Sequence, residues 1–430
     1  MISRDRIRSL ALAALVLGCN GTAQSLRAQA ARGDIAGALQ SYERHVRERG
    51  ASHPDAVQGI ASAVLEQSAR SDSVRGRNAA FSTLRSLGSR GRDILVDLAN
   101  TPGIVGDRAA SVIYEIDGRE GEPPARLLAA SQSLEPERRI AGLVVFEGRR
   151  DLLGLVAALD AESPEVRRSA ALRMGRWRDN PTVIERLGDC LRTDRDDGVR
   201  ATCVSSLGSQ GPTAFDRIVA AREDSSGFVR MAAMSALVSA DLNRAKPLLA
   251  PLMATPSTES VELARALAAR GDEPAIAHVF EVLAGANPAL RAQAAVAVSG
   301  LGERYEERLV TFVTDSDVEV KLRVAAALGR GGRRRDVAIA NLRPLAVSSD
   351  PLLAMRALLL LAELRDAAVT PAVRQALLSE QETIARLAVL AWSHLAGLSG
   401  EIDPLLPLLL RRDVGVRVLA AGEILRIASR

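Results

Sequence analysis

The sequence predicts an all-α fold, a right-handed α-α superhelix in which short helical hairpins stack side by side. A local pattern recurs every 29 to 33 residues over most of the chain, and a fixed period of this length is typical of repeat architectures. Most copies of the pattern begin with a residue type that caps helices. Aromatic residues make up only 3% of the chain, which favours thin, closely packed helices over sheets.

Residues 1–18 are a candidate export signal. Three arginines precede an apolar run over residues 10–17, and Cys19 follows it. The stretch Val16-Leu17-Gly18-Cys19 resembles a bacterial lipoprotein signal box, which implies that Cys19 carries a lipid. Secretion through a later site such as Ala28-Gln29-Ala30 and an uncleaved apolar N-terminus are the alternatives. No later segment reaches the roughly 20 apolar residues of a membrane-spanning helix, so we expect membrane contact only through a lipid anchor.

The residue after Cys19 bears on the compartment. Asn20 in this place resembles the arrangement that directs lipoproteins of Gram-negative cells to the outer membrane. For such a source, we expect an exported protein of the cell envelope, an outer-membrane lipoprotein that faces the periplasm.

Residues 24–70 differ from the rest of the chain. The pairs Gly33-Asp34 and Ala38-Leu39, followed by Tyr42, resemble tetratricopeptide-style helices. The similar segment is short, so we expect a helical N-terminal cap on the stack.

The periodic pattern occupies residues 72–430 and comprises about 11 to 12 units. An apolar anchor residue marks the same place in each unit. The clearest anchors are Val166, Val199, Val229, Val261, Leu290, Val320, Leu353, Ile384 and Val416.

Each unit is predicted to be a helical hairpin. A cap stands three residues before most anchors, as Asp196 does before Val199. Apolar residues follow at helical spacing, and glycines such as Gly208 and Gly329 are placed to end the first helix in a left-handed conformation. The second helix opens with a new cap or a proline, as at Pro181. One hairpin cannot bury both of its faces, so the units must stack.

These units resemble HEAT repeats, in particular the short bacterial type that also occurs in phycobilin lyases. The resemblance lies in a loosely kept string, Asp-x-x-Val-Arg-x-x-Ala-Ala-x-x-Leu-Gly, of which Asp196 to Gly208 is one copy. It implies a HEAT-like solenoid. The family includes scaffolds, transport receptors and enzyme accessories, so the resemblance alone does not select a function.

The sequence carries no pattern for catalysis, metal binding or cofactor binding. Its four histidines are too dispersed to form a ligand motif: they are His45, His53, His278 and His394. No phosphate-binding loop or nucleophile motif is present. We therefore expect a protein that is not an enzyme and has no cofactor. The alternative, which the resemblance permits, is an accessory or lyase-like factor acting with an enzyme or a small cofactor.

The charge balance argues against nucleic acid as the partner. The chain has 56 basic and 52 acidic residues, a formal net charge of +4. A nucleic-acid-binding solenoid is expected to carry a larger excess, arranged as a basic stripe. We expect a protein or peptide partner.

A few residues are candidate contacts or cross-links. Trp177 is placed in a turn, where it is either a partner contact or a simple turn residue. The turn formed by Arg333, Arg334 and Arg335 is either an anion site or a solvated loop. Cys190 and Cys203 fall on buried stripes of successive helices, and we expect two free buried thiols, with a disulfide as the alternative.

An arginine directly follows many anchors. It could form a ladder of ligand contacts, but we expect it to pair with acidic caps of neighbouring units, such as Asp196 or Asp317. These arginines are Arg167, Arg200, Arg230, Arg291 and Arg417.

The sequence thus predicts a non-catalytic interaction scaffold or adaptor of the cell envelope. We expect the partner to bind along the inner surface of the solenoid, and we expect the second helices to line that surface. Polar positions expected to face the partner are Glu185, Arg186, Asp216, Arg217, Arg244 and Arg374.

Overall fold

The protein is described by a computed structural model of residues 24–49, 54–299 and 301–428. It divides into two compact units: unit 1 comprises Met1–Gly118 and Ala346–Arg430, and unit 2 comprises Arg119–Leu345. Every regular element in the described ranges is a helix, and no strand occurs there. This confirms the predicted all-α class. The candidate signal of residues 1–18 and the proposed lipidation site Cys19 lie outside the described residues.

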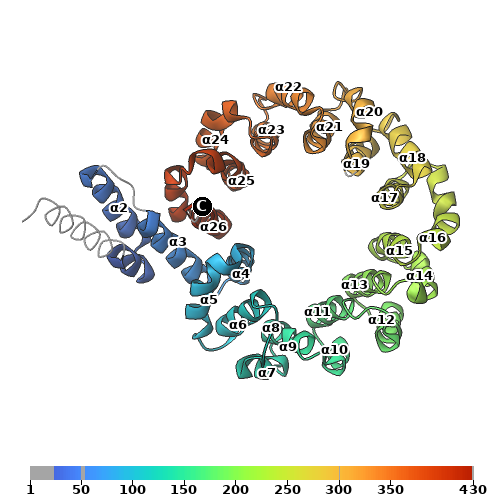
Figure 1. The fold of residues 1–430 in the computed structure, drawn as a ribbon, viewed down its shortest axis with the longest axis horizontal. Helices are drawn as coiled ribbons and strands as arrows, with labels where there is room; N and C mark the ends of the chain where they lie inside the picture. Colours follow the sequence, from blue (N-terminus) through green and yellow to red (C-terminus); the bar gives the residue numbers. More distant parts are fainter. Residues whose placement is uncertain (1–23, 50–53, 300, 429–430) are drawn as a thin grey trace, which may run out of the picture. The chain divides into compact units, whose positions relative to one another are not determined.

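Unit 2 is a row of helical hairpins (Figure 1). Its first helices, which carry the anchors, are α8 (Pro136–Gly142), α11 (Pro164–Met174), α13 (Asp197–Gly208), α15 (Gly227–Ala240), α17 (Thr258–Ala268), α19 (Pro288–Val298) and α21 (Val318–Gly331). Its remaining α-helices are α7 (Ala125–Ser131), α9 (Val144–Gly148), α10 (Leu152–Leu159), α12 (Pro181–Thr193), α14 (Phe215–Val219), α16 (Leu242–Leu249), α18 (Glu273–Leu283), α20 (Glu306–Val310) and α22 (Arg335–Leu345). Short 3-10 turns extend the second-helix layer at η2 (Pro212–Ala214), η3 (Ala220–Glu223), η4 (Ala250–Ala254) and η5 (Glu303–Tyr305).

The anchors form the core between the layers. Val199, Val229, Val261 and Val320 are fully buried, and Val166 is nearly so. Each first helix packs on the first helices before and after it, as α13 does on α11 and α15. Each second helix packs against the first helix that follows, as α12 does against α13. Burial of each apolar stripe therefore requires the neighbouring unit.

The predicted cap residues do cap most of the first helices. The side chains of Ser163, Asp196, Asn287, Asp317 and Asp350 each accept a backbone N–H of the first turn of α11, α13, α19, α21 and α23. Two positions differ. Ser226 precedes α15 without a side-chain cap bond. Helix α17 is capped by Ser257, one residue before the predicted Thr258.

The glycines predicted to end first helices have another role. Helix α13 ends at Gly208, but neither Gly208 nor Gly329 has a positive φ. A Cβ atom on Gly208 would lie 2.8 Å from the Cα atom of Ala236 on α15. Glycine is needed here because the two helices approach closely. The left-handed residue after α21 is Gly332, with φ of 100°.

Unit 1 joins helices from both ends of the chain. From the N-terminal part it contains a helix over residues 24–31, α2 (Ile35–Arg49), α3 (Pro54–Ala69), α4 (Val74–Leu87), α5 (Arg92–Ala99) and α6 (Ile104–Ile116), with a 3-10 turn η1 (Gly88–Gly91). From the C-terminal part it contains α23 (Pro351–Glu363), α24 (Thr370–Leu377), α25 (Glu382–Ser399) and α26 (Val414–Ala428), with 3-10 segments η6 (Ala367–Val369) and η7 (Asp403–Leu410).

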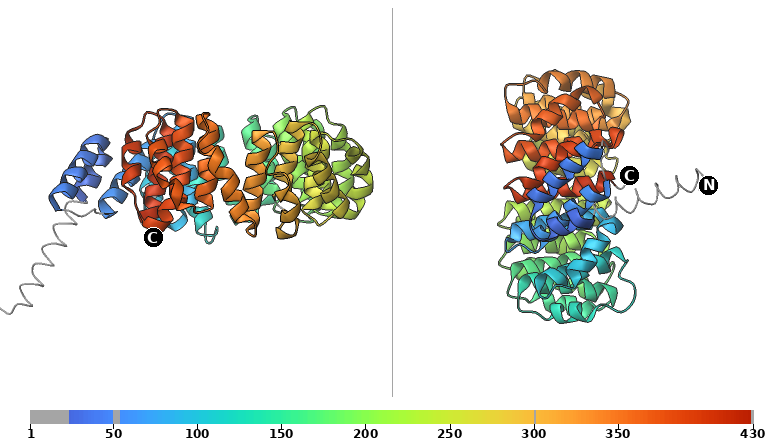
Figure 2. Two further views of the ribbon diagram at one scale, coloured as in Figure 1. Left: turned by 90° about the horizontal axis from the view of Figure 1, so that it is seen from above. Right: turned by 90° about the vertical axis from the view of Figure 1, so that its left-hand side faces the viewer.

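Helix α3 completes the last hairpin. In unit 2 a second helix such as α18 packs between its own first helix, α17, and the next one, α19. Helix α3 packs in the same way between α26 and α4, and Figures 1 and 2 show the blue N-terminal helices beside the dark red C-terminal ones. The Gln58 Nε2 atom donates to the carbonyl of Ala428 at 3.1 Å. The segment 24–70, predicted as a cap, thus supplies a second helix for α26, while its boundary as a domain stays a prediction.

Candidate interaction surface

An arginine–aspartate ladder fixes the first helices of unit 2 to one another. The Arg167 Nε and Nη2 atoms donate to the Asp194 carboxylate at 2.7 and 2.8 Å. The two-bond pattern recurs between Arg200 and Asp224, at 2.9 Å for both bonds. Arg291 and Asp315 repeat it at 2.9 and 3.0 Å. Such bidentate pairs hold both position and orientation.

The same aspartates organise the turn before each first helix. Asp194 Oδ1 accepts the backbone N–H of Asp196 at 2.9 Å. The Arg200 Nη1 atom donates to the carbonyl of Asp194 at 2.9 Å. Each ladder step therefore joins a first helix, the loop before it and the loop of the next unit.

The ladder shifts the acidity of its carboxyl groups. Burial acts to raise the pKa of Asp194, but the hydrogen bonds from Arg167 and from the Asp196 N–H hold that pKa below its usual range. Bonding to Arg200 lowers the pKa of Asp224 in the same way. For Asp315, burial again opposes the shift and Arg291 lowers the pKa. All three side chains therefore favour the charged form.

Arg167, Arg200 and Arg291 pair with acidic residues of the next unit, as expected, but their partners are not the predicted caps. The partner is the aspartate two residues before the cap, and the cap Asp196 is instead 3.5 Å from Arg168. The Oδ1 atom of Asp196 accepts the Val199 N–H and is the atom that Arg168 contacts, while Asp194 faces Arg167. Arg230 departs from the pattern, since its nearest acidic atom belongs to Glu259 at 3.7 Å.

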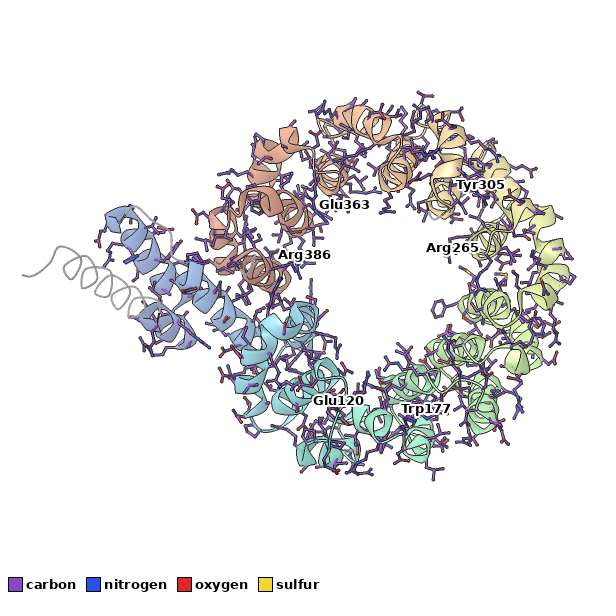
Figure 3. All side chains as sticks on the ribbon, viewed as in Figure 1. Glu120, Trp177, Arg265, Tyr305, Glu363 and Arg386 are labelled. Carbon is purple, nitrogen blue, oxygen red and sulfur yellow. A yellow bond between two sulfur atoms is a disulfide. The ribbon has the colours of Figure 1, made fainter. Side chains whose placement is uncertain are left out.

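The first helices line the concave side of unit 2, and the second helices lie on its outer side (Figure 1). Arg265 on α17 projects from this concave side (Figure 3). The expectation that second helices line the inner surface is therefore wrong for unit 2. The first helices carry small residues where they pack together, which allows the closer spacing that a concave side requires.

Four of the six polar positions predicted on second helices lie in ion pairs. Arg186 contacts Asp160 at 2.9 Å, and Arg244 contacts Asp216 at 2.5 Å. In unit 1, Arg374 contacts Glu401 at 2.7 Å. These pairs join consecutive second helices across the outer layer. Glu185 is exposed on α12, and Arg217 lines a pocket of about 320 Å³ with Leu191, Glu223 and others.

Large apolar side chains remain exposed on several first helices of unit 2. Leu172 on α11 and Phe228 on α15 are each 63% exposed, and Val296 on α19 is 43% exposed. Because the other sides of these helices pack on neighbours, such side chains point away from the second helices. We call the exposed side of α11, α13, α15, α17, α19 and α21 the first-helix face.

The sequence offered one signal for this face that was missed. Phe228 stands directly before the anchor Val229. The same position holds Glu165 and Glu319 in other units. A large aromatic residue at a position that is acidic in these two units and small in several others is a signal for an exposed apolar contact.

The remaining predicted residues are dispersed. Trp177 lies half-buried in the turn between α11 and α12 (Figure 3). In the arginine turn, Arg333 donates to Glu303 at 2.8 Å, and Arg334 donates to Glu307 at 2.6 Å, while Arg335 is exposed at the start of α22. Two of the three cations are thus neutralised by the preceding unit. Anion binding by this turn and a partner contact at Trp177 stay predictions.

Cys190 and Cys203 form a disulfide, with Cα atoms 6.3 Å apart. The expectation of two free thiols is therefore corrected. The bond joins α12 to α13, and this Cα separation lies within the range that a disulfide can bridge. The two-bond step between Arg167 and Asp194 lies beside it in the chain and fixes the same pair of units.

No catalytic constellation emerges from the described residues. His278 is buried, its Nε2 atom lies 3.1 Å from Ser260 Oγ, and burial lowers its pKa. The Ser260 hydroxyl is held in the cap of α17, since it donates to the Ser257 carbonyl and accepts the Ser257 N–H. This serine is part of a helix start and does not line the pocket beside Arg217. No cluster of metal-ligating side chains is found in the described part of the chain.

The comparison with protein families identifies the repeat. The family described as HEAT repeats matches residues 152–208 and 184–270. HEAT repeats are thus shown for residues 152–270. The matched HEAT segment begins at α10 and extends through α17, so it includes the ladder steps at Arg167 and Arg200. A comparison with curated proteins finds no match.

The chain is similar to several solved structures at low identity. A crystal structure of Kap121p is 11% identical, with 95% of this chain and 66% of that chain covered and a TM-score of 0.41. A Kap95p structure with RanGDP is 14% identical, with 85% and 60% covered and a TM-score of 0.36. The CpcE–CpcF complex of phycocyanin lyase from Nostoc sp. PCC7120 is 16% identical, with 64% and 94% covered and a TM-score of 0.29. Likenesses of this strength carry no information on partner or activity.

No described helix combines the length and the apolar character that crossing a membrane requires.

Proposed function

We propose that this HEAT-repeat protein is a non-catalytic scaffold or adaptor that binds a protein or peptide along the first-helix face of unit 2. The observation that carries the proposal is the exposure of Leu172 and Phe228 on helices that the ladder holds in place. Exposed apolar side chains on a fixed surface lose little conformational entropy when a partner covers them. Aromatic and large aliphatic residues are also frequent anchors of protein interfaces.

The chemistry of the unit supports binding by shape and distributed contacts. The charged residues of the ladder already neutralise one another, so they offer little to a charged ligand. The apolar residues are spread over α11, α15 and α19, which favours an extended partner that touches several repeats. We place this scaffold in the cell envelope, tethered through Cys19, as the sequence predicts.

Crosslinking in the native cell followed by mass spectrometry tests the proposal. A variant with Leu172→Asp and Phe228→Asp should lose most of the crosslinks that the unchanged protein forms with its main partner. The matched control is Leu134→Asp with Leu153→Asp, because these two side chains are 97% and 75% exposed outside the first helices. Equal crosslinking by both variants would reject the first-helix face.

The tether is tested separately. Cys19→Ser should move the protein from the membrane fraction to the soluble fraction, because the thiol is the acceptor of the lipid. Unchanged fractionation would remove the tether and leave the scaffold proposal to the crosslinking result. An absorption band of a bound chromophore in the purified protein would instead favour the lyase-like alternative.

A further inference from the structure

Two adjoining pockets lie in unit 1 where the N-terminal helices meet α26. One has a volume of about 520 Å³ and is lined by α3, the turn after it and α26. The other, of about 290 Å³, is lined by the start of α2, by α3 and by η7. Gln67 and Arg417 line both pockets. Volumes of this size suit small molecules.

Arg417 occupies the ladder position of the last first helix. It directly follows the anchor Val416, as Arg200 follows Val199. In α11, α13 and α19, the arginine at this position holds an aspartate carboxylate through two hydrogen bonds. The position is therefore one where this fold binds a carboxylate.

The carboxylate is missing at Arg417. The first helix packed against α26 is α4, whose cap is Ser73. In the complete steps, the aspartate stands two residues before the cap, and here that residue is Ser71. The Ser71 Oγ atom accepts the Ser73 N–H at 3.2 Å, as Asp194 does for Asp196. The serine thus keeps the turn but offers the guanidinium no negative charge.

The charges around the larger pocket leave one cation and one anion unpaired. Its lining contains Glu66, Arg70, Asp72 and Arg417. Glu66 and Arg70 contact each other at 3.1 Å. The side chains of Asp72 and Arg417 form no hydrogen bond or ion pair with any residue in the described ranges. The pocket therefore has no net charge but two separate, opposite charged groups.

We propose that this pocket binds a small zwitterion of the amino-acid class, either a free amino acid or a short peptide with free ends. The ligand's carboxylate forms the two-bond pair with Arg417 that the other ladder steps form with aspartate. Its ammonium group faces Asp72. A simple anion would satisfy Arg417 but leave the Asp72 carboxylate facing a like charge.

Calorimetric titration of the full chain with three matched peptides tests this site. The probes are trialanine with free ends, trialanine with an acetylated N-terminus and trialanine with an amidated C-terminus. We expect the free peptide to bind at least tenfold more tightly than either blocked form, because each block removes one of the two charges. Absence of detectable binding of free trialanine, or equal binding of a blocked form, would overturn the proposal.

Substitutions test which residue binds each end of the peptide. Arg417→Gln should weaken binding of the free peptide by roughly tenfold or more, and Arg417→Lys should weaken it less, because lysine keeps the charge without the planar two-bond geometry. Asp72→Asn should abolish the preference for the free over the acetylated peptide. Arg270→Gln is the matched control, since that side chain is exposed in unit 2, and it should bind as the unchanged protein does.

A folding readout accompanies each variant. Asp72 is exposed in a turn, so Asp72→Asn should retain the melting curve of the unchanged protein even if Arg417→Gln does not. Retention of the free-end preference by a folded Asp72→Asn variant would overturn the assignment of the ammonium group. The outcome of these titrations does not depend on the crosslinking experiment, because the pocket belongs to unit 1 and the first-helix face to unit 2.

Discussion

At the scale of single residues, the ladder arginine is the position that most strongly orders the polar contacts between neighbouring repeats. In three first helices its guanidinium is largely buried and bound to a carboxylate that is itself largely buried. A buried ion pair does not by itself add much stability, because both charges lose their hydration. Removal of one partner is costly, however, since the other then remains as an unpaired charge. The ladder therefore specifies how neighbouring units align.

Asp224→Ala tests this at one step of the ladder. It leaves Arg200 partly buried without a carboxylate, and we expect it to lower the free energy of unfolding by about 3 kcal/mol. The control Asp216→Ala removes an exposed partner of Arg244 and should cost less than about 1 kcal/mol. Urea unfolding followed by circular dichroism measures both. Equal losses in the two variants would contradict the distinction between ladder pairs and outer-layer pairs.

The lowered carboxyl pKa values predict how stability depends on pH. For Asp194, Asp224 and Asp315 the folded pKa lies below the ordinary value of 3.8. A group with a lowered folded pKa contributes stability above the unfolded pKa and loses it as the pH falls through the folded pKa. We therefore expect the ladder contribution to be complete above about pH 5 and to decline below about pH 4.

Melting temperatures over this range provide the measurement. The unchanged protein should melt at progressively lower temperature below about pH 4. In Asp224→Asn this decline should be shallower, because one of the linked groups no longer titrates. A parallel decline in both proteins would show that the ladder carboxylates are not the groups responsible.

At the scale of the elements, the disulfide joins a second helix to the following first helix, α12 to α13. These helices also pack against each other. The covalent bond spans 13 residues, a loop short enough that its loss releases a limited amount of chain entropy. The bond consequently secures one hairpin boundary within the segment that matches HEAT repeats.

Reduction of the disulfide tests that role. Cys190→Ala with Cys203→Ala should lower the free energy of unfolding by about 3 kcal/mol, the entropy-model value for a loop of this size. Treatment of the unchanged protein with dithiothreitol should have an effect of similar size, and the same treatment of the double variant should have none. If thiol titration of the unreduced, unfolded protein showed that Cys190 and Cys203 both react as free thiols, the disulfide would be contradicted.

At the scale of the whole chain, the repeat series makes up two compact units, and one of them contains both ends of the sequence. In unit 1, α26 is the first helix of a hairpin whose second helix comes from the N-terminal segment. The buried residues of α26 include Val418, Ala421 and Ile424, and α3 is one of the elements packed on this helix, together with α4, α25 and η7. The N-terminal helices are therefore structural partners of the last repeat.

Removal of residues 24–70 tests this partnership. Hydrogen–deuterium exchange should increase in residues 414–428, because α26 loses the helix that covers it. Exchange in α18 of unit 2 should stay as it was, which provides an internal control. Unchanged protection of residues 414–428 would show that α3 is dispensable for the last hairpin.

The sequence alone determined the helical class, the period of the repeat and most first-helix caps, because caps and apolar stripes depend on residues within one or two turns of each other. Asp196 before Val199 is such a local signal. It also predicted that the arginine after the anchor pairs with acidic residues of neighbouring units, which holds for Arg167, Arg200 and Arg291.

Only the tertiary structure decided which partners are used. Asp194, and not the cap Asp196, faces Arg167 in the folded chain, and Cys190 meets Cys203 because α12 and α13 pack closely. The first helices face the concave side because of how they pack on one another, which no single unit reveals. Arg417 opens into a pocket because α4, at the other end of the chain, lies against α26 and brings a serine where other steps bring an aspartate.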